Sequence, residues 1–251
     1  MQTIGAPITI KRIIAGSCWQ LFASVNGYAD STTNDLVTQV LKGRSFQVID
    51  ECSKNSCLRD EFGRFRVRLL EDGYQCWIKC SEVIGHAFEC GPWQPTLLTK
   101  DQIQQKLTHV LSWLENAARK NNQYLWGGTI GPDFDCSGLV QSAFASQQIW
   151  LPRDAYQQER FCEVIEIGIS NFQSLRAGDL LFFGTPQKCT HVAVYMGAGM
   201  YCHSSGIMNG RNGIGFDPLE GFVQNSIAAY YFSEFRGAGR VVRCHDGMTL
   251  P

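Results

Sequence analysis

The sequence predicts two domains of different class: a small β-barrel, followed by an α+β domain of helices and an antiparallel sheet. Three observations indicate this division. Short alternating runs with turn dipeptides fill the first part, prolines and a glycine interrupt the chain near residue 90, and helical hydrophobic spacing begins after residue 100. The 251 residues suffice for two domains of roughly 100–200 residues each. We place the domains at 1–89 and 101–251, with a linker at 90–100.

The first domain reads as a series of short strands. In the run 64–70 (RFRVRLL), Phe65, Val67 and Leu69 face one way and arginines face the other, which is typical of a half-buried strand. Turn dipeptides separate such runs, at Asn26-Gly27, Lys42-Gly43, Phe62-Gly63 and Asp72-Gly73. Strands of this length and spacing predict a small β-barrel.

The second domain begins with helices and continues with strands. Apolar residues fall at helical spacing from Ile103 to Ala118, and Thr99 with Gln102 predicts a capping box before them. A second helix is expected to begin at Cys136. Strand-like apolar runs follow at 179–184, 191–196, 200–204 and 240–243. Helices followed by strands predict an α+β domain with an antiparallel sheet.

Charge and composition exclude several classes of partner. Lys and Arg number 22 against 23 Asp and Glu, so the chain lacks the basic surplus typical of nucleic-acid or anionic-membrane binding. No apolar run reaches the ~18–20 residues of a membrane span. Lys11 and Arg12 are not followed by an apolar stretch, so we expect no secretory signal and a cytoplasmic location. The eleven cysteines are then expected to be reduced thiols.

Cys136 is the first candidate for chemistry. The partial positive charge and free N–H groups of a helix N-terminus favour a thiolate over a thiol, as a nucleophilic cysteine requires. The alternative is a buried core cysteine, which is the commoner fate of a free cysteine.

Two histidines fall on one predicted hairpin. A turn at Gly197-Ala198-Gly199, centred on Ala198, pairs His191 with Ser205 and His203 with Ala193. Both imidazoles then lie on one face as diagonal neighbours, roughly 7–8 Å apart at the backbone. A base with a polar orienting group behind it fits an activated cysteine. A register slip of one residue separates the two faces.

Metal binding is the competing chemistry. Cys136, His191, His203 and Cys202 are ligand types that zinc accepts, but Cys202 points to the opposite face from His203. A second set resembles a loosely spaced zinc ribbon and consists of Cys52, Cys57, Cys76 and Cys80. Cys76 and Cys80 are ~13 Å apart if they share one strand, too far for one zinc ion. We therefore expect no metal and no cofactor.

Several ordered motifs resemble one enzyme family. They are Tyr124-Leu125-Trp126-Gly127-Gly128, Asp135-Cys136-Ser137-Gly138, Leu151-Pro152-Arg153-Asp154, Ala177-Gly178-Asp179-Leu180, His191-Val192 and Tyr201-Cys202-His203-Ser204. With them, the second domain resembles the NlpC-type cell-wall cysteine peptidases, which have a papain-like α+β core. The first domain, through its strand pattern and the run 71–74, resembles the bacterial SH3-like domains that precede it in cyanobacterial members.

The resemblance implies a reaction and its residues. The family hydrolyses the γ-D-glutamyl–diamino acid bond of peptidoglycan stem peptides. By analogy Cys136 is the nucleophile, His191 the general base and His203 the polar residue that orients His191. Tyr124 falls where the family has a tyrosine near the oxyanion, and its alternative role is a packed aromatic.

The resemblance also implies substrate contacts. Asp135 and Ser137 face the acyl side of the substrate, where an acidic residue pairs with a free N-terminal amine; Asp135 is equally suited to cap a helix. Arg153 and Asp154 match an arginine–aspartate pair at the cleft, with a surface salt bridge as the alternative. Tyr74 is expected to reach from the SH3-like domain to the far end of the pocket, or else to be a plain surface tyrosine.

These features predict an endopeptidase that recycles released tri- or tetrapeptides with a free N-terminal L-Ala. Diaminopimelate and lysine are both compatible as the diamino acid. The alternatives are an exported hydrolase of intact wall, a related thiol acyltransferase or amidase, and a non-catalytic wall-binding protein. The intact Cys136, His191 and His203 argue against the non-catalytic alternative.

Overall fold

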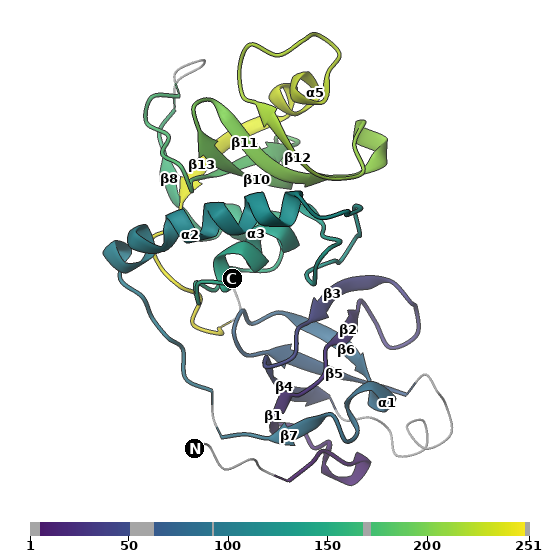
Figure 1. Cartoon of the computed structure of the whole chain (residues 1–251). Helices are drawn as coiled ribbons and strands as arrows, with labels where there is room; N and C mark the ends of the chain where they lie inside the picture. Colours follow the sequence, from purple (N-terminus) through teal and green to yellow (C-terminus); the bar gives the residue numbers. More distant parts are fainter. Residues whose placement is uncertain (1–5, 51–62, 92, 168–171, 249–251) are drawn as a thin grey trace. The chain divides into compact units, whose positions relative to one another are not determined.

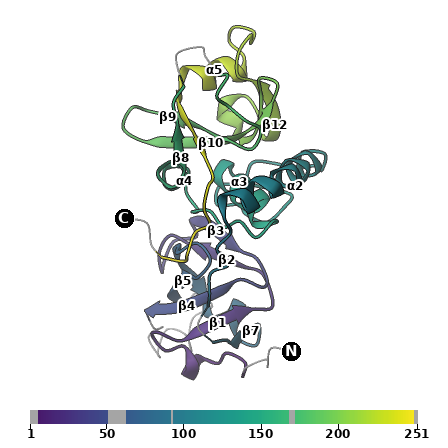
Figure 2. The ribbon, with the colours of Figure 1, turned by 90° about the vertical axis from the view of Figure 1, so that its left-hand side faces the viewer.

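The computed structural model describes residues 6–50, 63–91, 93–167 and 172–248. The chain divides into two compact units, shown in Figures 1 and 2. The first comprises the chain up to Pro95 together with the C-terminal segment from Asp246, and the second is Thr96–His245. Between them, the described part of 90–99 contains no helix or strand; Pro92 of the predicted linker lies outside the described residues.

The first unit is a curled antiparallel sheet. Its strands are β1 (Cys18–Leu21), β2 (Val25–Tyr28), β3 (Leu36–Val40), β4 (Ser45–Asp50), β5 (Arg64–Leu69), β6 (Gln75–Lys79) and β7 (Ala87–Glu89), with short helices η1 (Ile10–Arg12) and α1 (Cys80–Val83). They are joined in the order β3-β2-β6-β5-β4-β1-β7. Val40 and Ala87, from the two edges, share one core with Phe46 of β4. Because both edges contribute to the same core, the sheet wraps around it, which confirms the predicted small β-barrel class.

The alternation predicted for β5 is present, with one difference. Phe65, Val67 and Leu69 are fully buried. Arg64 is buried as well, because its guanidinium lies 3.8 Å from the Tyr28 ring centroid and donates to Asn34 Oδ1 at 2.7 Å. A cation–π contact and a hydrogen bond thus replace the expected exposure to solvent.

The turns predicted at the glycine-containing dipeptides are only partly present. Gly43 and Gly73 adopt positive φ in turns, at 93° and 70°. Asn26-Gly27 instead lies inside β2, so the turn expected there was wrong. A Cβ on Gly27 would lie 2.7 Å from the Thr38 side chain and 2.8 Å from Cys76 Sγ, so this glycine permits close packing between strands. Phe62 lies outside the described residues.

A buried ion cluster holds the β5–β6 turn. Arg44 pairs with Glu71 (Nε to Oε2, 3.1 Å) and with Asp72 (Nη2 to Oδ2, 2.8 Å). The C-terminal segment packs against the same turn, since a Cβ on Gly73 would lie 2.5 Å from the Met248 carbonyl oxygen. This contact explains why the segment from Asp246 belongs to the first unit, although it lies within the expected range 101–251. Tyr74 is half-buried and packs on the core of the first unit.

The second unit is a six-stranded antiparallel sheet with helices on both faces (Figure 1). Its elements are α2 (Lys100–Ala118), α3 (Cys136–Ala145), α4 (Ala155–Phe161), β8 (Glu163–Ile165), β9 (Leu180–Gly184), β10 (Cys189–Gly197), β11 (Met200–Ser205), η2 (Ile207–Asn209), β12 (Gly213–Pro218), α5 (Ile227–Ser233) and β13 (Phe235–Arg240). The strand order is β12-β11-β10-β9-β13-β8. This confirms the predicted α+β class; the strand expected at 240–243 instead ends at Arg240.

Helices α3 and α4 pack against β10 on one face, and α5 covers the other through Ile227 and Tyr231. The capping box predicted before α2 is present: Gln102 N donates to Thr99 Oγ1 at 3.3 Å, and Thr99 N donates to Gln102 Oε1 at 2.9 Å. The first residue of α3, Cys136, lies near the beginning of β10, where the N–H of Val192 hydrogen-bonds toward its sulfur. Among the described residues, no helix has the length and apolarity needed to cross a bilayer.

Candidate active site

The β10–β11 hairpin has the predicted register. Val194 pairs with Cys202 and Tyr195 with Tyr201, and the strands shift only at the turn, where Ala198 adopts φ 50°. His191 Nε2 lies 2.8 Å from His203 Nδ1. The prediction that the two imidazoles share one face and hydrogen-bond is therefore confirmed.

The hydrogen-bond chain continues beyond the predicted residues. His203 Nε2 lies 2.7 Å from Asp217 Oδ2, on the neighbouring strand β12. Arg211 Nη2 donates to both carboxylate oxygens of Asp217 at 2.8 Å. Sequence reasoning missed Asp217 and Arg211, because two Asn-Gly dipeptides, at 209–210 and 212–213, leave the centre of the turn before β12 undecided, and a change of one residue in register moves Asp217 to the other face.

Cys136 lies beside this histidine pair. The N–H of Val192, the residue after His191, hydrogen-bonds toward the Cys136 sulfur. Tyr231 stacks on the His191 ring with centroids 4.3 Å apart. The charge of a Cys136 thiolate contributes to the raised pKa of the Tyr231 hydroxyl, so the two groups interact electrostatically. The first residue of α3 thus lies against the beginning of β10, the end of the strand that carries His191.

Burial decides the resting protonation state of Cys136 and His191. It raises the pKa of the Cys136 thiol to about 12, and the Asp135 charge adds to this effect, while the N–H groups of Val192 and Ser137 oppose it. Burial, and secondarily the charge of His203, lowers the pKa of His191 well below 6.5. Both shifts favour a neutral thiol and a neutral imidazole in the free site, and so oppose the preference of a helix N-terminus for a thiolate.

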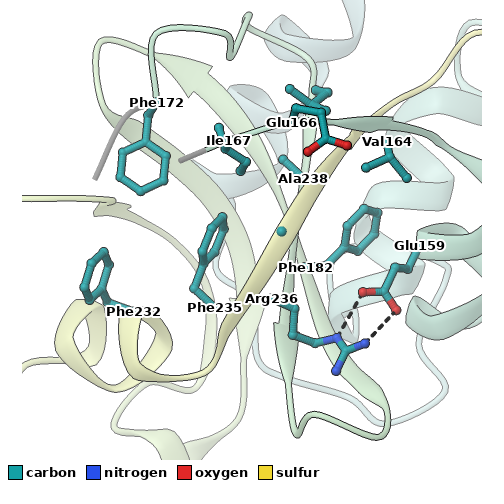
Figure 3. A pocket seen from close by; sticks show the side chains of 12 residues that line it. Glu159, Val164, Glu166, Ile167, Phe172, Phe182, Phe232, Phe235, Arg236 and Ala238 are labelled. Atoms are coloured by element: carbon teal, nitrogen blue, oxygen red, sulfur yellow. Dashed lines mark hydrogen bonds and ion pairs between the residues drawn. The ribbon is translucent and has the colours of Figure 1, made fainter. Parts of the chain in front are cut away.

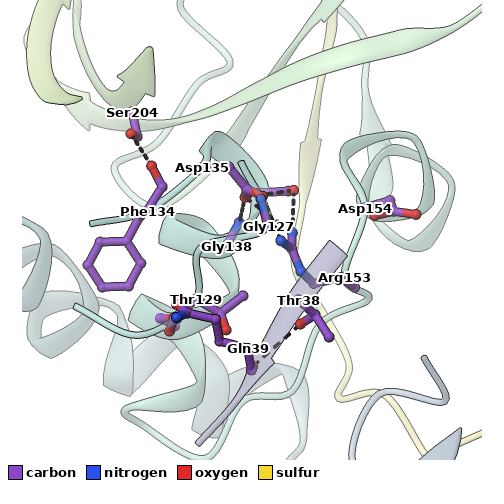
Figure 4. A network of polar contacts seen from close by, with 12 residues as sticks. Thr38, Gln39, Gly127, Thr129, Phe134, Asp135, Gly138, Arg153, Asp154 and Ser204 are labelled. Carbon is purple, nitrogen blue, oxygen red and sulfur yellow. Dashed lines mark hydrogen bonds and ion pairs between the residues drawn. The ribbon is translucent and has the colours of Figure 1, made fainter. Parts of the chain in front are cut away.

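Asp135 is the N-cap of α3 (Figure 4). Its Oδ1 accepts from Gly138 N at 2.6 Å, and its Oδ2 accepts from Gly127 N at 2.9 Å and from Arg153 Nη2 at 2.6 Å. Arg153 Nη1 also donates to Ser137 Oγ at 2.9 Å. Of the two roles open for Asp135, the structure shows the helix cap, combined with a buried ion pair that the sequence did not predict.

The other residues predicted to contact the substrate are Arg153, Asp154 and Tyr74. Arg153 is 2% exposed, so it is not a surface salt bridge. Asp154 is the N-cap of α4 and its N–H donates to Gln157 Oε1 at 3.2 Å. Tyr74 belongs to the first unit. Roles of these residues toward a substrate stay predictions.

Tyr124 lies within electrostatic reach of the thiol. Burial raises the pKa of its hydroxyl, and the charge of a Cys136 thiolate raises it further, which keeps the hydroxyl a proton donor. Its backbone is anchored by the donation of Tyr124 N to Asn212 Oδ1 at 3.2 Å. This position is compatible with the predicted contact to an oxyanion, which stays a prediction.

Within the described ranges, no group of three or more His, Cys, Asp and Glu residues has the geometry of a metal site. Cys202 faces away from His203, as alternation in β11 requires. Cys52 and Cys57 of the second candidate set lie outside the described residues.

A separate pocket of about 500 Å³ lies beside β8 and β13 (Figure 3). Phe172, Phe232 and Phe235 line it, and the ion pair of Arg236 Nε with Glu159 Oε1 (3.0 Å) lies at its rim. Its described lining contains no cysteine or histidine. The chemistry is therefore assigned to the Cys136 site.

A buried cysteine at a helix N-terminus, with a hydrogen-bonded histidine pair on the facing hairpin, defines the second unit as a catalytic domain of the cysteine-hydrolase class. Residues 121–233 match the NlpC/P60 family, and residues 28–83 match the bacterial dipeptidyl-peptidase SH3 domain. The chain thus combines an NlpC/P60 domain, of a family of cysteine peptidases, with a bacterial SH3 domain.

Curated relatives match within the catalytic unit. The γ-D-glutamyl-L-lysine dipeptidyl-peptidase of Bacillus subtilis (strain 168) is 38% identical over 84 residues, which are 32% of this chain and 27% of the relative. The bifunctional muramidase/DL-endopeptidase CwlT of the same organism is 41% identical over 87 residues, 33% of this chain and 25% of the relative. The match thus spans about a quarter of each relative's length. A crystal structure of an NlpC/P60 family protein from Bacillus cereus ATCC 10987 has a TM-score of 0.43 and 22% identity, and the alignment covers 90% of this chain and 64% of that one.

Proposed function

We propose that the chain is a cysteine endopeptidase that hydrolyses the γ-D-glutamyl–L-diamino acid bond of peptidoglycan stem peptides. The observation that carries this proposal is the placement of Cys136 beside the His191–His203 pair, whose ring nitrogens are 2.8 Å apart. A relative named as a γ-D-glutamyl-L-lysine dipeptidyl-peptidase supports the bond type.

The geometry suggests how the reaction proceeds. His191 Nε2 is occupied by His203, so Nδ1 is the nitrogen that takes the thiol proton as sulfur attacks the γ-carbonyl carbon. The Tyr124 hydroxyl donates to the oxyanion of the tetrahedral intermediate. Protonated His191 then delivers its proton to the departing amine. A water molecule, deprotonated by His191, hydrolyses the resulting thioester and restores the free thiol.

We propose a substrate with a free N-terminal L-Ala. A dipeptidyl-peptidase, as the relative is named, releases two residues from a free amino end. Such an end arises only after the stem peptide has been detached from its glycan, which favours a role in recycling and a cytoplasmic location. This proposal does not rest on Asp135, whose oxygens already accept from Gly127, Gly138 and Arg153.

The test compares L-Ala-γ-D-Glu-diaminopimelate, its lysine counterpart and the N-acetylated form of each, with products identified by mass spectrometry. We expect release of L-Ala-D-Glu from the free peptides and a kcat/KM that is roughly 10²-fold or more lower for the acetylated ones, because a site that hydrogen-bonds a free amine discriminates strongly against a substrate that lacks it. Folded Cys136→Ala, the control, should be inactive. Equal rates with and without the acetyl group indicate a hydrolase of attached wall peptides, and absence of cleavage refutes the endopeptidase.

A further inference from the structure

We propose that Asp217 is a positioning residue, which acts through His203 to hold His191 in the tautomer that can accept the Cys136 proton. The proposal rests on the proposed function for the identity of the reaction. Its geometric basis, however, depends only on five interacting side chains, those of Cys136, His191, His203, Asp217 and Arg211.

The hydrogen-bond chain permits one arrangement of protons. A neutral imidazole has one N–H donor and one acceptor nitrogen, whereas an ionised carboxylate only accepts. His203 Nε2 lies 2.7 Å from Asp217 Oδ2, which can only accept, so the proton of His203 must be on Nε2. His203 Nδ1 must then accept, so His191 carries its proton on Nε2, 2.8 Å away. The lone pair of His191 is left on Nδ1, the ring nitrogen that His203 does not occupy.

The charges around Asp217 keep this arrangement in place. Burial alone raises the pKa of Asp217, but its hydrogen bond and charge interaction with His203, together with the Arg211 charge, hold that pKa below its usual value. Burial lowers the pKa of His203 although Asp217 opposes this effect. Asp217 is thus ionised while His203 is neutral at neutral pH, as the tautomer argument requires. The titratable and charged groups that face His203 are His191 of β10, Tyr201 of β11, Asp217 of β12, Tyr231 of α5 and Arg211.

Gly215 makes room for this arrangement. It pairs with His203 in the β11–β12 register, two residues before Asp217. A Cβ at this position would lie 1.8 Å from Arg211 Nη1. Because Gly215 has no side chain, the Arg211 guanidinium can lie across β12 and donate to both carboxylate oxygens of Asp217. Since Arg211 can swing away, Gly215→Ala is a variant that weakens the Arg211–Asp217 pair and leaves the carboxylate in place.

The first variant is Asp217→Asn, which keeps the shape of the side chain. Arg211 only donates, so the amide oxygen turns to Arg211 and the amide NH₂ to His203 Nε2, which must then accept. Both tautomers reverse, and His191 presents an N–H to the thiol. We expect kcat/KM on the stem peptide to fall roughly 10²-fold or more with KM little changed. Gly215→Ala and Arg211→Gln should instead shift the acid limb of the kcat/KM profile to higher pH, because the Arg211 charge lowers the pKa of His203 and its loss lets the histidine pair protonate more easily.

The second readout does not need the peptide. Alkylation of Cys136 by iodoacetamide is followed by peptide mapping from pH 5 to 9, with Cys18 as an internal reference in the same protein. We expect the Cys136 rate in Asp217→Asn to fall at least tenfold, to the level of His191→Ala, with unchanged Cys18 alkylation. Thermal unfolding of each variant is recorded, and Arg211→Gln provides the second test if Asp217→Asn does not fold.

The outcomes separate the two proposals. If a folded Asp217→Asn protein is alkylated at Cys136 like the wild type at every pH, the positioning role is wrong, whatever the substrate. If the wild type cleaves no stem peptide but its Cys136 alkylation depends on Asp217, the positioning role stands and the proposed substrate is wrong.

Discussion

At the scale of single residues, two opposing effects act on the Cys136 thiol. The N–H groups of Ser137 and Val192 stabilise a thiolate, whereas burial destabilises it more strongly, so that the thiol pKa rises to about 12. Burial has the opposite effect on His191 and lowers the pKa of its imidazole. Both shifts favour transfer of the thiol proton to His191 as sulfur attacks the carbonyl, rather than a preformed thiolate–imidazolium pair.

This state predicts the pH profile of the reaction. A protonated His191 cannot accept the thiol proton, so kcat/KM should fall about tenfold per pH unit on the acid limb. Because burial lowers the pKa of His191 well below 6.5, the limb should have its midpoint below pH 6.5 and activity should be level above it to neutral pH. Steady-state kinetics from pH 4.5 to 8 measures this midpoint. A midpoint at or above 6.5 contradicts the neutral resting pair.

The ion pair beneath the nucleophile gives a second prediction at this scale. In Asp135→Asn the side chain still caps α3, since Asn and Asp are comparable N-caps. Arg153, however, is left buried without the charge that faces it at 2.6 Å. Loss of one partner of a buried pair lowers the free energy of unfolding by about 3–5 kcal/mol. Urea unfolding measures the loss; Asp133→Asn, in the same loop, should change it by less than about 1 kcal/mol because its contact to Gln123 N needs only an oxygen.

At the scale of elements, the sequence predicts the strand pairings that are set by turn residues and by alternation close in the chain. The Gly197–Gly199 turn and the alternation around it fix the β10–β11 register, and hence the His191–His203 contact. Before β12 the sequence offers two possible turns, at Asn209-Gly210 and Asn212-Gly213, which imply different registers with β11, so Asp217 could not be placed beside His203 from the sequence. Likewise nothing in the sequence indicates that Arg153 returns to Asp135, because that contact depends on how α3 and the following loop pack.

The entry to α3 depends on Gly138. A Cβ at this position would lie 2.0 Å from the Gly128 carbonyl oxygen, a backbone atom that cannot swing away. Gly138→Ala gains about 1 kcal/mol of helix propensity but must displace the Gly127–Gly128 loop that holds Asp135. We expect at least a tenfold loss of kcat/KM and faster hydrogen exchange in residues 124–138. Gly91→Ala, with nothing within 4 Å of its Cβ, is the control; unchanged activity in Gly138→Ala would refute this close packing.

At the scale of the whole molecule, the two units bury titratable groups of opposite type. In the second unit burial lowers the pKa values of His191 and His203 below 6.5. In the first, burial raises the pKa of Glu71 above 4.5, although Arg44 and the Ser45 N–H oppose it. The folded second unit thus binds fewer protons than its unfolded chain below pH 6.5. The folded first unit binds more than its unfolded chain between 4.5 and the raised pKa of Glu71.

Acid should therefore shift the stability of the two units in opposite directions. Stability from the neutral histidines is complete above pH 6.5 and is lost as the pH falls, by about 2 kcal/mol between pH 7 and 5 for each histidine that stays neutral when folded. Stability of the first unit rises as the pH falls through the raised pKa of Glu71 toward 4.5. Hydrogen exchange at pH 7 and pH 5, with labelling times scaled to intrinsic exchange, should show weaker protection in β9–β11 and equal or stronger protection in β4–β6. His203→Gln, which removes one of the two titrating groups, should reduce the loss in β9–β11 without changing β4–β6. A parallel decline of both units in the wild type would mean that groups other than His191, His203 and Glu71 govern the acid response.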